Sequence, residues 1–115
     1  MDLTKDQNPD SPEEQARIER MGGFVSPPPE PGLSARVWLD PEFRQIGLAM
    51  GRSIGDHALK DVGVIAEPVV TTYDVTPEDD FLVLATDGVW EFLSSQQAVA
   101  IVAACLLYTS PSPRD

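Results

Sequence analysis

The sequence predicts an α+β fold, in which helical patterns near both ends of the chain flank several strand-like segments. Three observations carry this prediction. Residues 12–21 show the signature of a short helix, residues 81–85 form an apolar run, and a capping motif at Ser94 opens an apolar segment with helical spacing. A chain of 115 residues usually holds one domain at most, with a modest core.

The first helix is predicted from the residues at its two ends. Ser11 suits the N-cap, Pro12 stands at the first helical position, and acidic residues fill the first turn. The pair Gly22 and Gly23 ends the pattern. We therefore expect a helix over residues 12–21, after a polar loop.

Short apolar or valine-rich segments between the helices predict strands. Residues 26–32 separate the first two strands as a stiff, polyproline-like loop. We interpret this loop as a spacer, with a ligand for a proline-recognition domain as the lesser alternative. The expected strands lie near Phe24 and at residues 36–39, 46–50, 69–73 and 81–85.

The segment 79–91 contains the residues with the clearest chemistry. Residues 81–85 have the pattern of a buried strand, and the run ends on a Thr-Asp-Gly sequence centred on Asp87. Glu91 follows Asp87 by four residues, so one helical turn would place both carboxylates on the same side. Two hard oxygen ligands on one side suit Mg²⁺ or Mn²⁺. The alternative is a β-hairpin, because Asp-Gly is a favoured two-residue turn.

The residues that follow favour a helix over a hairpin. Ser94 and Gln97 have the spacing of a capping box at the start of an apolar-periodic helix. The apolar residues of this helix have the spacing of one buried face. They are Ala98, Val99, Ile101, Val102 and Cys105.

The charge balance makes some partners unfavourable. With 19 acidic against 8 basic residues, the net charge of −11 disfavours nucleic acid and anionic membranes as partners and suits cation binding. Cys105 is the single cysteine, so it forms no internal disulfide, which fits a reducing compartment. No apolar run has the length of a membrane span, and the polar start is not a signal peptide. We expect a soluble, intracellular protein of the cytoplasm, the nucleus or both.

Six blocks of the sequence carry a family resemblance by their order and spacing: residues 6–9, 17–19, 22–25, 47–56, 63–68 and 81–95. Together they resemble the PP2C (PPM-type) metal-dependent protein serine/threonine phosphatases. The resemblance implies a four-layer α/β/β/α sandwich, with two antiparallel sheets flanked by helices. It also implies a binuclear Mg²⁺ or Mn²⁺ centre whose bridging water attacks the phosphorus of phosphoserine or phosphothreonine in a protein substrate.

The resemblance further suggests which residues bind metal. Asp87 resembles the family aspartate that binds the second core metal and faces a third, weaker site. Asp6 resembles a ligand of that third site, and Glu91 stands where the family has an Asp. Two departures affect the shape of the third site. Gln7 and Asn8 replace the family's His and Lys, and Glu91 is one methylene longer than Asp.

The chain resembles the middle-to-late part of a family domain. We expect residues 1–104 to be a partial PPM-type phosphatase domain, and residues 105–115 to be a tail outside the family pattern. That tail resembles translated sequencing adaptor, and we expect it to be disordered or artefactual. In family order, the phosphate-binding Arg, the bridging Asp and the general-acid His lie before Asp6. We therefore expect this fragment alone to be inactive and the intact parent to be a monomeric enzyme.

Two alternative functions compete with this interpretation. A non-catalytic, pseudophosphatase-like or regulatory module would keep the fold and bind a partner. A haloacid-dehalogenase-like phosphatase also places an Asp at the end of a strand. That class has a second Asp two residues later, where this chain has Val89, which argues against it.

Other conspicuous residues have structural interpretations. We expect His57, the single histidine, to be exposed and to have no catalytic role. Asp56 should cap a turn or helix, and Trp38 and Trp90 should serve in packing. Arg52 is either structural or close to the substrate groove.

Overall fold

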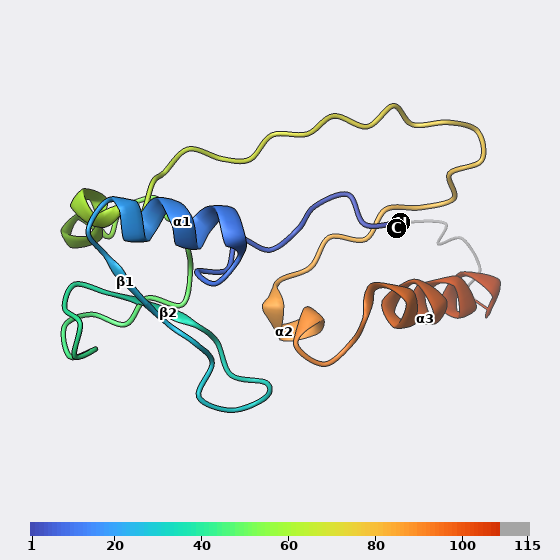
Figure 1. Cartoon of the computed structure of the whole chain (residues 1–115). Helices are drawn as coiled ribbons and strands as arrows, with labels where there is room; N and C mark the ends of the chain where they lie inside the picture. The colour runs from blue at the N-terminus through green and yellow to red at the C-terminus, as the bar shows by residue number, and fades with distance from the viewer. Residues whose placement is uncertain (109–115) are drawn as a thin grey trace. The chain divides into compact units, whose positions relative to one another are not determined.

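The structure, a computed structural model, describes residues 1–108 and divides into two compact units. One unit is Thr4–Thr71, and the other combines Met1–Leu3 with the chain from Thr72 onward. Figure 1 shows the elements in chain order: α1 (Pro12–Arg20), β1 (Phe24–Ser26), β2 (Arg36–Trp38), the 3₁₀ helix η1 (His57–Val62), α2 (Asp87–Trp90) and α3 (Ser95–Tyr108). The first four belong to the unit Thr4–Thr71. Residues 109–115, which hold most of the predicted tail, lie outside the described residues.

Helix α1 begins at the predicted residue, Pro12, and ends at Arg20, one residue before the predicted end. Ser11 is the N-cap with an extended backbone, and its carbonyl accepts the first helical bond from the Gln15 N–H at 2.8 Å. Its hydroxyl makes no capping bond, so Pro12 and the acidic first turn define this end. At the other end, the Gly23 N–H donates to the Ile18 carbonyl at 2.9 Å and closes the helix.

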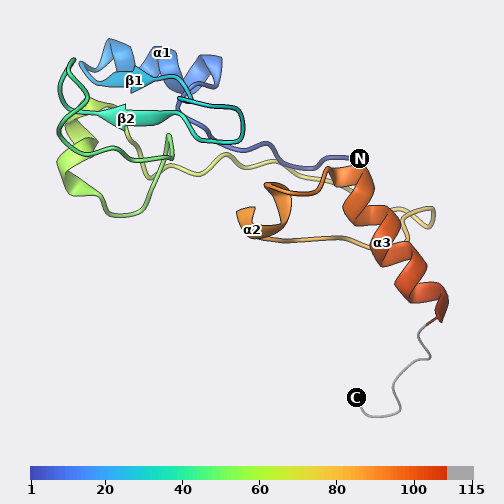
Figure 2. The same cartoon turned by 90° about the horizontal axis from the view of Figure 1, so that it is seen from below.

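Strands β1 and β2 form an antiparallel pair beside α1, as Figure 2 shows. In their register Val25 lies opposite Val37, and Ser26 lies opposite Arg36. The connecting loop contains a β-turn, in which the Leu33 N–H donates to the Glu30 carbonyl at 3.1 Å. Gly32 supplies the positive φ of +90° that the third position of a type II turn requires, after Pro31 at the second.

Two predicted strands of this unit are shorter or absent. Residues 46–50 contribute only one antiparallel bridge, between Leu48 and Val37, and residues 69–73 form no strand. The prediction of strands at these positions was wrong for this chain. A strand needs a continuous neighbour for its backbone groups. Within the described residues, 46–50 meet one residue of β2 and 69–73 meet no strand.

The apolar core of this unit joins α1, β2 and η1. Ile18, Val37, Leu59 and Val64 are fully or almost fully buried and form one cluster. Burying a side chain of this size contributes about 1.5–3 kcal/mol. Gly63 allows the chain after η1 to approach α1, because a Cβ there would lie 2.9 Å from the Cα of Ile18. Its φ of +93° also favours glycine.

A buried carboxylate connects α1 to the later part of the same unit. Glu14 is 2% exposed, although it lies in the first helical turn. Arg52 donates to it from two nitrogens on one edge of its guanidinium, Nε to Oε1 at 2.9 Å and Nη2 to Oε2 at 3.0 Å. Arg17 donates from Nη2 to Oε1 at 2.8 Å. Within the described residues, Arg52 therefore has a structural role.

The two guanidinium groups extend this network to the backbone. Arg17 donates to the carbonyls of Gly63 and Gly51, each at 2.8 Å. Arg52 donates to the carbonyl of Glu67 at 2.9 Å. Among the described residues, no buried side-chain nitrogen or oxygen lacks a hydrogen-bond partner. The burial of Glu14 is therefore fully compensated.

The second unit begins with a well-defined turn. The carboxylate of Asp79 accepts from the Thr76 N–H at 2.8 Å and from the Tyr73 hydroxyl at 2.8 Å. The hydrogen bond from the Thr76 N–H, and after it the bond from Tyr73, lowers the pKa of Asp79. The bond to the Asp79 carboxylate raises the pKa of the Tyr73 hydroxyl. The turn precedes the apolar run at 81–85, as its polar sequence suggests.

Residues 81–85 do not form the buried strand that the sequence predicts. They have no regular secondary structure, and Leu82 and Leu84 are 65% and 80% exposed. The alternation of side chains is suited to a sheet, but within the described residues no strand pairs with this segment. The apolar pattern alone therefore does not produce a strand.

Helix α3 begins with the predicted capping box. The Ser94 hydroxyl accepts from the Gln97 N–H at 3.1 Å, and the Gln97 side chain accepts from the Ser94 N–H at 2.8 Å. The predicted buried face is only partly correct. Ala98 is buried, whereas Ile101 and Cys105 are exposed. None of the described helices is both long and apolar enough to cross a bilayer.

Replacing Glu14 by Gln should destabilise the protein by about 3 kcal/mol, because the two guanidinium groups lose their anionic partner. Urea denaturation followed by far-UV circular dichroism measures the change. Glu13→Gln is the matched control, since Glu13 is exposed in the same helical turn and should change stability by less than about 0.5 kcal/mol. Equal stability of the two variants would contradict a structural role for Glu14.

Stability should also fall in acid because of Glu14. Burial alone would raise its pKa, but hydrogen bonds from Arg52 and then Arg17, with their charges, outweigh burial and lower the pKa from 4.5 to about 2. Since the folded pKa lies below the unfolded one, this stabilisation is fully present above pH 4.5 and disappears as the pH falls towards 2. Thermal unfolding between pH 6 and pH 2 should show a steeper loss for the natural chain than for Glu14→Gln. Parallel profiles would argue against this origin.

Candidate metal site

The candidate site is built on the single helical turn of α2. Thr86 is its N-cap with extended backbone, and its carbonyl accepts from the Val89 N–H at 3.0 Å. The Glu91 N–H donates to the Asp87 carbonyl at 2.9 Å and completes the turn. The Asp-Gly pair thus lies in a helical turn, so the β-hairpin alternative is wrong, and the turn precedes the helix that the sequence predicts after Ser94.

Asp87 and Glu91 are therefore one helical turn apart. Residues at this spacing are neighbours on the same side of a helix. Both residues are exposed, so ions and water can reach them. Their carboxylate oxygens are of the type that Mg²⁺ and Mn²⁺ prefer.

Local hydrogen bonds hold this turn in place. The indole Nε1 of Trp90 donates to the Ala85 carbonyl at 2.9 Å, across the turn that contains Asp87. The Leu93 N–H donates to the Val89 carbonyl at 3.0 Å and continues the reversal of the chain. Trp90 thus positions the carboxylate pair through the backbone, a more specific role than the packing predicted for it.

Asp6, the third predicted ligand, belongs to the other unit. It is exposed, and its neighbour Gln7 makes hydrogen bonds through both its backbone and its side chain. The Gln7 carbonyl accepts from the Gly51 N–H at 2.8 Å, and its side-chain amide donates to the Lys5 carbonyl at 3.0 Å. The loop that carries Asp6 is therefore fixed to its own unit. Its participation in a site with Asp87 stays a prediction.

No complete metal site is present in the part of the chain that the structure describes. Within residues 1–108, no three His, Cys, Asp or Glu residues gather as they would around an ion. The assignment of Asp87 and Glu91 as metal ligands therefore stays a prediction, which their spacing of one helical turn makes testable.

Other residues singled out by the sequence have structural positions. His57 is exposed at the start of η1. Asp56 is the N-cap of that helix, with a left-handed backbone and no side-chain capping bond, and its carbonyl accepts from the Leu59 N–H at 2.9 Å. Trp38 packs on Phe43, with ring centroids 5.8 Å apart.

The burial of Glu14 and its ion pairs were not predicted from the sequence. The i, i+3 spacing of Glu14 and Arg17 was a usable signal for one of these pairs.

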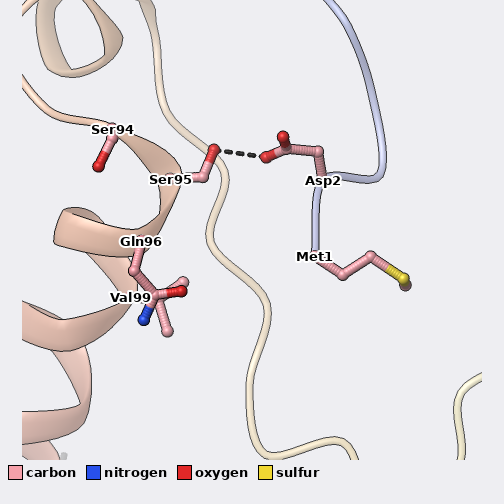
Figure 3. A pocket seen from close by; sticks show the side chains of 6 residues that line it. All are labelled: Met1, Asp2, Ser94, Ser95, Gln96 and Val99. Carbon is pink, nitrogen blue, oxygen red and sulfur yellow. Dashed lines mark hydrogen bonds between the residues drawn. The ribbon is translucent and has the colours of Figure 1, made fainter.

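A shallow pocket of about 360 Å³ lies at the start of α3 (Figure 3). The Ser95 hydroxyl donates to the carboxylate of Asp2 across it. It contains none of the predicted metal ligands, and we assign it no role in binding metal. Its lining residues are Met1, Asp2, Ser94, Ser95, Gln96 and Val99.

Comparison with known proteins decides the family. The family model described as protein phosphatase 2C matches residues 1–114. The chain belongs to the protein phosphatase 2C family. Asp87 and Glu91, the predicted metal ligands, lie within the matched residues.

Curated relatives in plants are similar over most of this chain. "Probable protein phosphatase 2C 12" of Oryza sativa subsp. japonica is 54% identical over 103 residues, which cover 89% of this chain and 26% of the relative. "Probable protein phosphatase 2C 6" of Arabidopsis thaliana is 47% identical over 102 residues, which cover 89% of this chain and 21% of the relative. The chain thus spans about a quarter of these relatives.

A solved structure supports the fold assignment. The crystal structure of a serine-threonine phosphatase 2C from Toxoplasma gondii matches with a TM-score of 0.79 at 33% identity. The match covers 92% of this chain and 36% of that protein. The predicted class is confirmed, because the described helices and two-stranded antiparallel sheet are part of a protein phosphatase 2C fold.

The carboxylate pair should bind Mn²⁺ weakly, in about the millimolar range, since most of the coordination shell is left to water. Isothermal titration calorimetry of the full chain should show this binding, and Asp87→Ala should remove it. Asp80→Ala, which changes another exposed aspartate, should leave it intact. Equal binding by the Asp87→Ala chain would mean that the motif is structural here.

Proposed function

We propose that this chain is part of a protein serine/threonine phosphatase that hydrolyses phosphoserine and phosphothreonine with bound Mg²⁺ or Mn²⁺. The observation that carries the proposal is the exposed pair Asp87 and Glu91 on one helical turn, in a chain of the protein phosphatase 2C family. The substrates would be phosphorylated proteins. The net charge of −11 supports a site that attracts cations and disfavours nucleic acid.

The residues of this chain would hold the cation rather than perform the bond-breaking step themselves. Asp87, held by the turn that Trp90 fixes, would supply one anionic oxygen ligand. Glu91 would supply a peripheral ligand on the same side, and Asp6 a third from the preceding loop. The bound cations would acidify water and stabilise charge on the phosphoryl group.

The cellular setting belongs to the same proposal. We propose that the intact parent acts as a monomer inside the cell, in the cytoplasm, the nucleus or both. Its single cysteine suits a reducing compartment.

A non-catalytic, pseudophosphatase-like or regulatory module is the second candidate. Two observations favour it for this chain. Among residues 1–108 no three metal-binding side chains gather, and Gln7 and Asn8 replace the family's His and Lys beside Asp6. Such a module would bind a phosphoprotein or another partner without turnover. Activity measurements on the parent separate the two candidates.

In the intact parent, Asp87→Asn should lower hydrolysis of a phosphopeptide by about two orders of magnitude or more, because one anionic ligand is lost from the centre that must acidify water. Glu91→Gln should cost less, since it removes a peripheral, water-rich contact. Steady-state phosphate release with Mn²⁺ measures both variants, and Asp80→Asn is the matched control.

The 115-residue chain by itself should show no Mn²⁺-dependent turnover, because the family's phosphate-binding Arg and general-acid His lie before Asp6 in family order. Positioning of the phosphate and acid catalysis each contribute several kcal/mol in sites of this kind. Robust turnover by the purified chain, lost in Asp87→Asn, would overturn this expectation. An Asp87→Asn parent with full activity would overturn the proposed function itself.

A further inference from the structure

Ser26 occupies an unusual junction in the unit Thr4–Thr71. It is the last residue of β1, is half-buried, and is followed by three exposed prolines, Pro27, Pro28 and Pro29. We propose that Ser26 is a phosphorylation site for a proline-directed serine/threonine kinase, with Arg36 and Trp38 receiving the phosphate. This inference goes beyond the proposed phosphatase function.

The segment after Ser26 is suited to an extended substrate pose. Prolines have no backbone N–H, so residues 27–29 cannot donate to a sheet. They favour an extended polyproline conformation, and all three are exposed. The next hydrogen-bonded feature along the loop is the β-turn at residues 30–33. A kinase that selects serine followed by proline and binds its substrate as an extended chain would find both features at Ser26.

The neighbours of the Ser26 hydroxyl suit a phosphate. The indole Nε1 of Trp38 donates to Oγ at 2.9 Å. In the strand register Ser26 lies directly opposite Arg36, whose side chain is exposed and donates from Nη1 to the Gly47 carbonyl at 2.5 Å, so a phosphate would use its other N–H groups. A phosphoserine carries a charge of about −1.5 to −2 and three strong acceptor oxygens. A guanidinium and an indole N–H on the facing strand provide donors for these oxygens.

A second Ser-Pro pair in the same unit provides an internal comparison. Ser11 is followed by Pro12, which is the first residue of α1. The backbone after Ser11 is therefore helical, and modification in an extended pose would require the first turn of α1 to unwind. The structure thus separates two equal dipeptides by their backbone conformation.

The transfer itself is a simple phosphoryl exchange. The Ser26 Oγ would attack the γ-phosphorus of ATP, which the kinase supplies with Mg²⁺. A new Oγ–P bond forms, the bond between the γ-phosphorus and the bridging oxygen breaks, and ADP leaves. The hydroxyl proton passes to the catalytic base of the kinase.

The test uses the full chain, a purified mitogen-activated protein kinase and Mg-ATP, with peptide mapping by mass spectrometry. Ser26 should be phosphorylated at least about tenfold faster than Ser11, because the residues after Ser26 are already in an exposed loop, whereas those after Ser11 must first unwind from α1. Pro27→Ala should remove labelling while leaving the hydroxyl, and Ser26→Ala should remove the labelled peptide. The reaction is repeated in the Asp87→Asn background, so that any dephosphorylation by the chain cannot hide the product.

A synthetic peptide of residues 21–32 shows whether the kinase accepts the sequence. A labelled peptide with an unlabelled chain would overturn the proposal, because the folded protein would withhold the serine. An unlabelled peptide would overturn it as well, and equal labelling of Ser11 and Ser26 would remove the structural argument. Two further Ser-Pro pairs, at Ser110 and Ser112, lie outside the described residues and are mapped separately.

A second measurement tests the role of Arg36. A facing guanidinium should lower the second pKa of the phosphate below its usual value of about 6. Phosphorus NMR titration of the modified chain measures this pKa, and Arg36→Gln should return it towards the usual value. Arg44→Gln is the control, since Arg44 lies outside the paired strands. An unchanged pKa in Arg36→Gln would refute the assigned contact.

Discussion

The bidentate contact between Arg52 and the buried Glu14 carboxylate is the interaction on which the unit Thr4–Thr71 depends. A carboxylate that is 2% exposed is tolerated only when charged donors satisfy it. One donor, Arg17, comes from the same helix, and the other is 38 residues further along the chain. Because apolar burial is non-directional, this network is what specifies how α1 meets the segments before and after η1.

The candidate metal site depends on a different kind of constraint. Asp87 and Glu91 are placed by hydrogen bonds between residues no more than five apart, including that from Trp90 to Ala85. Such a turn can form in a chain that covers 36% of a solved relative. Asp6, the other proposed ligand, belongs to the unit Thr4–Thr71, where local bonds of this kind do not connect it to Asp87.

The two proposals of a metal site at Asp87 and a phosphorylation site at Ser26 concern different units of the chain. Asp87 belongs to the unit that begins at Thr72, whereas Ser26 belongs to the unit Thr4–Thr71. The first suits a cation through exposed carboxylates, and the second suits a phosphate through Arg36 and an indole N–H. The proposed metal site would therefore use negatively charged ligands, and the proposed phosphoserine site would use a positively charged one, as a cation and a phosphate respectively require.

The sequence by itself determined the features that arise from neighbouring residues. The start and end of α1, the capping box of Ser94 and Gln97, and the turn from Asp87 to Glu91 need only bonds within a few residues. Only the tertiary structure decided the strands and the buried charge. The apolar run at 81–85 lacks a pairing strand and stays irregular, while Glu14, polar on any scale, is buried because two arginines meet it there. The missing strand partner and Arg52, which completes the contacts of Glu14, are distant in sequence, and local patterns do not reveal such partners.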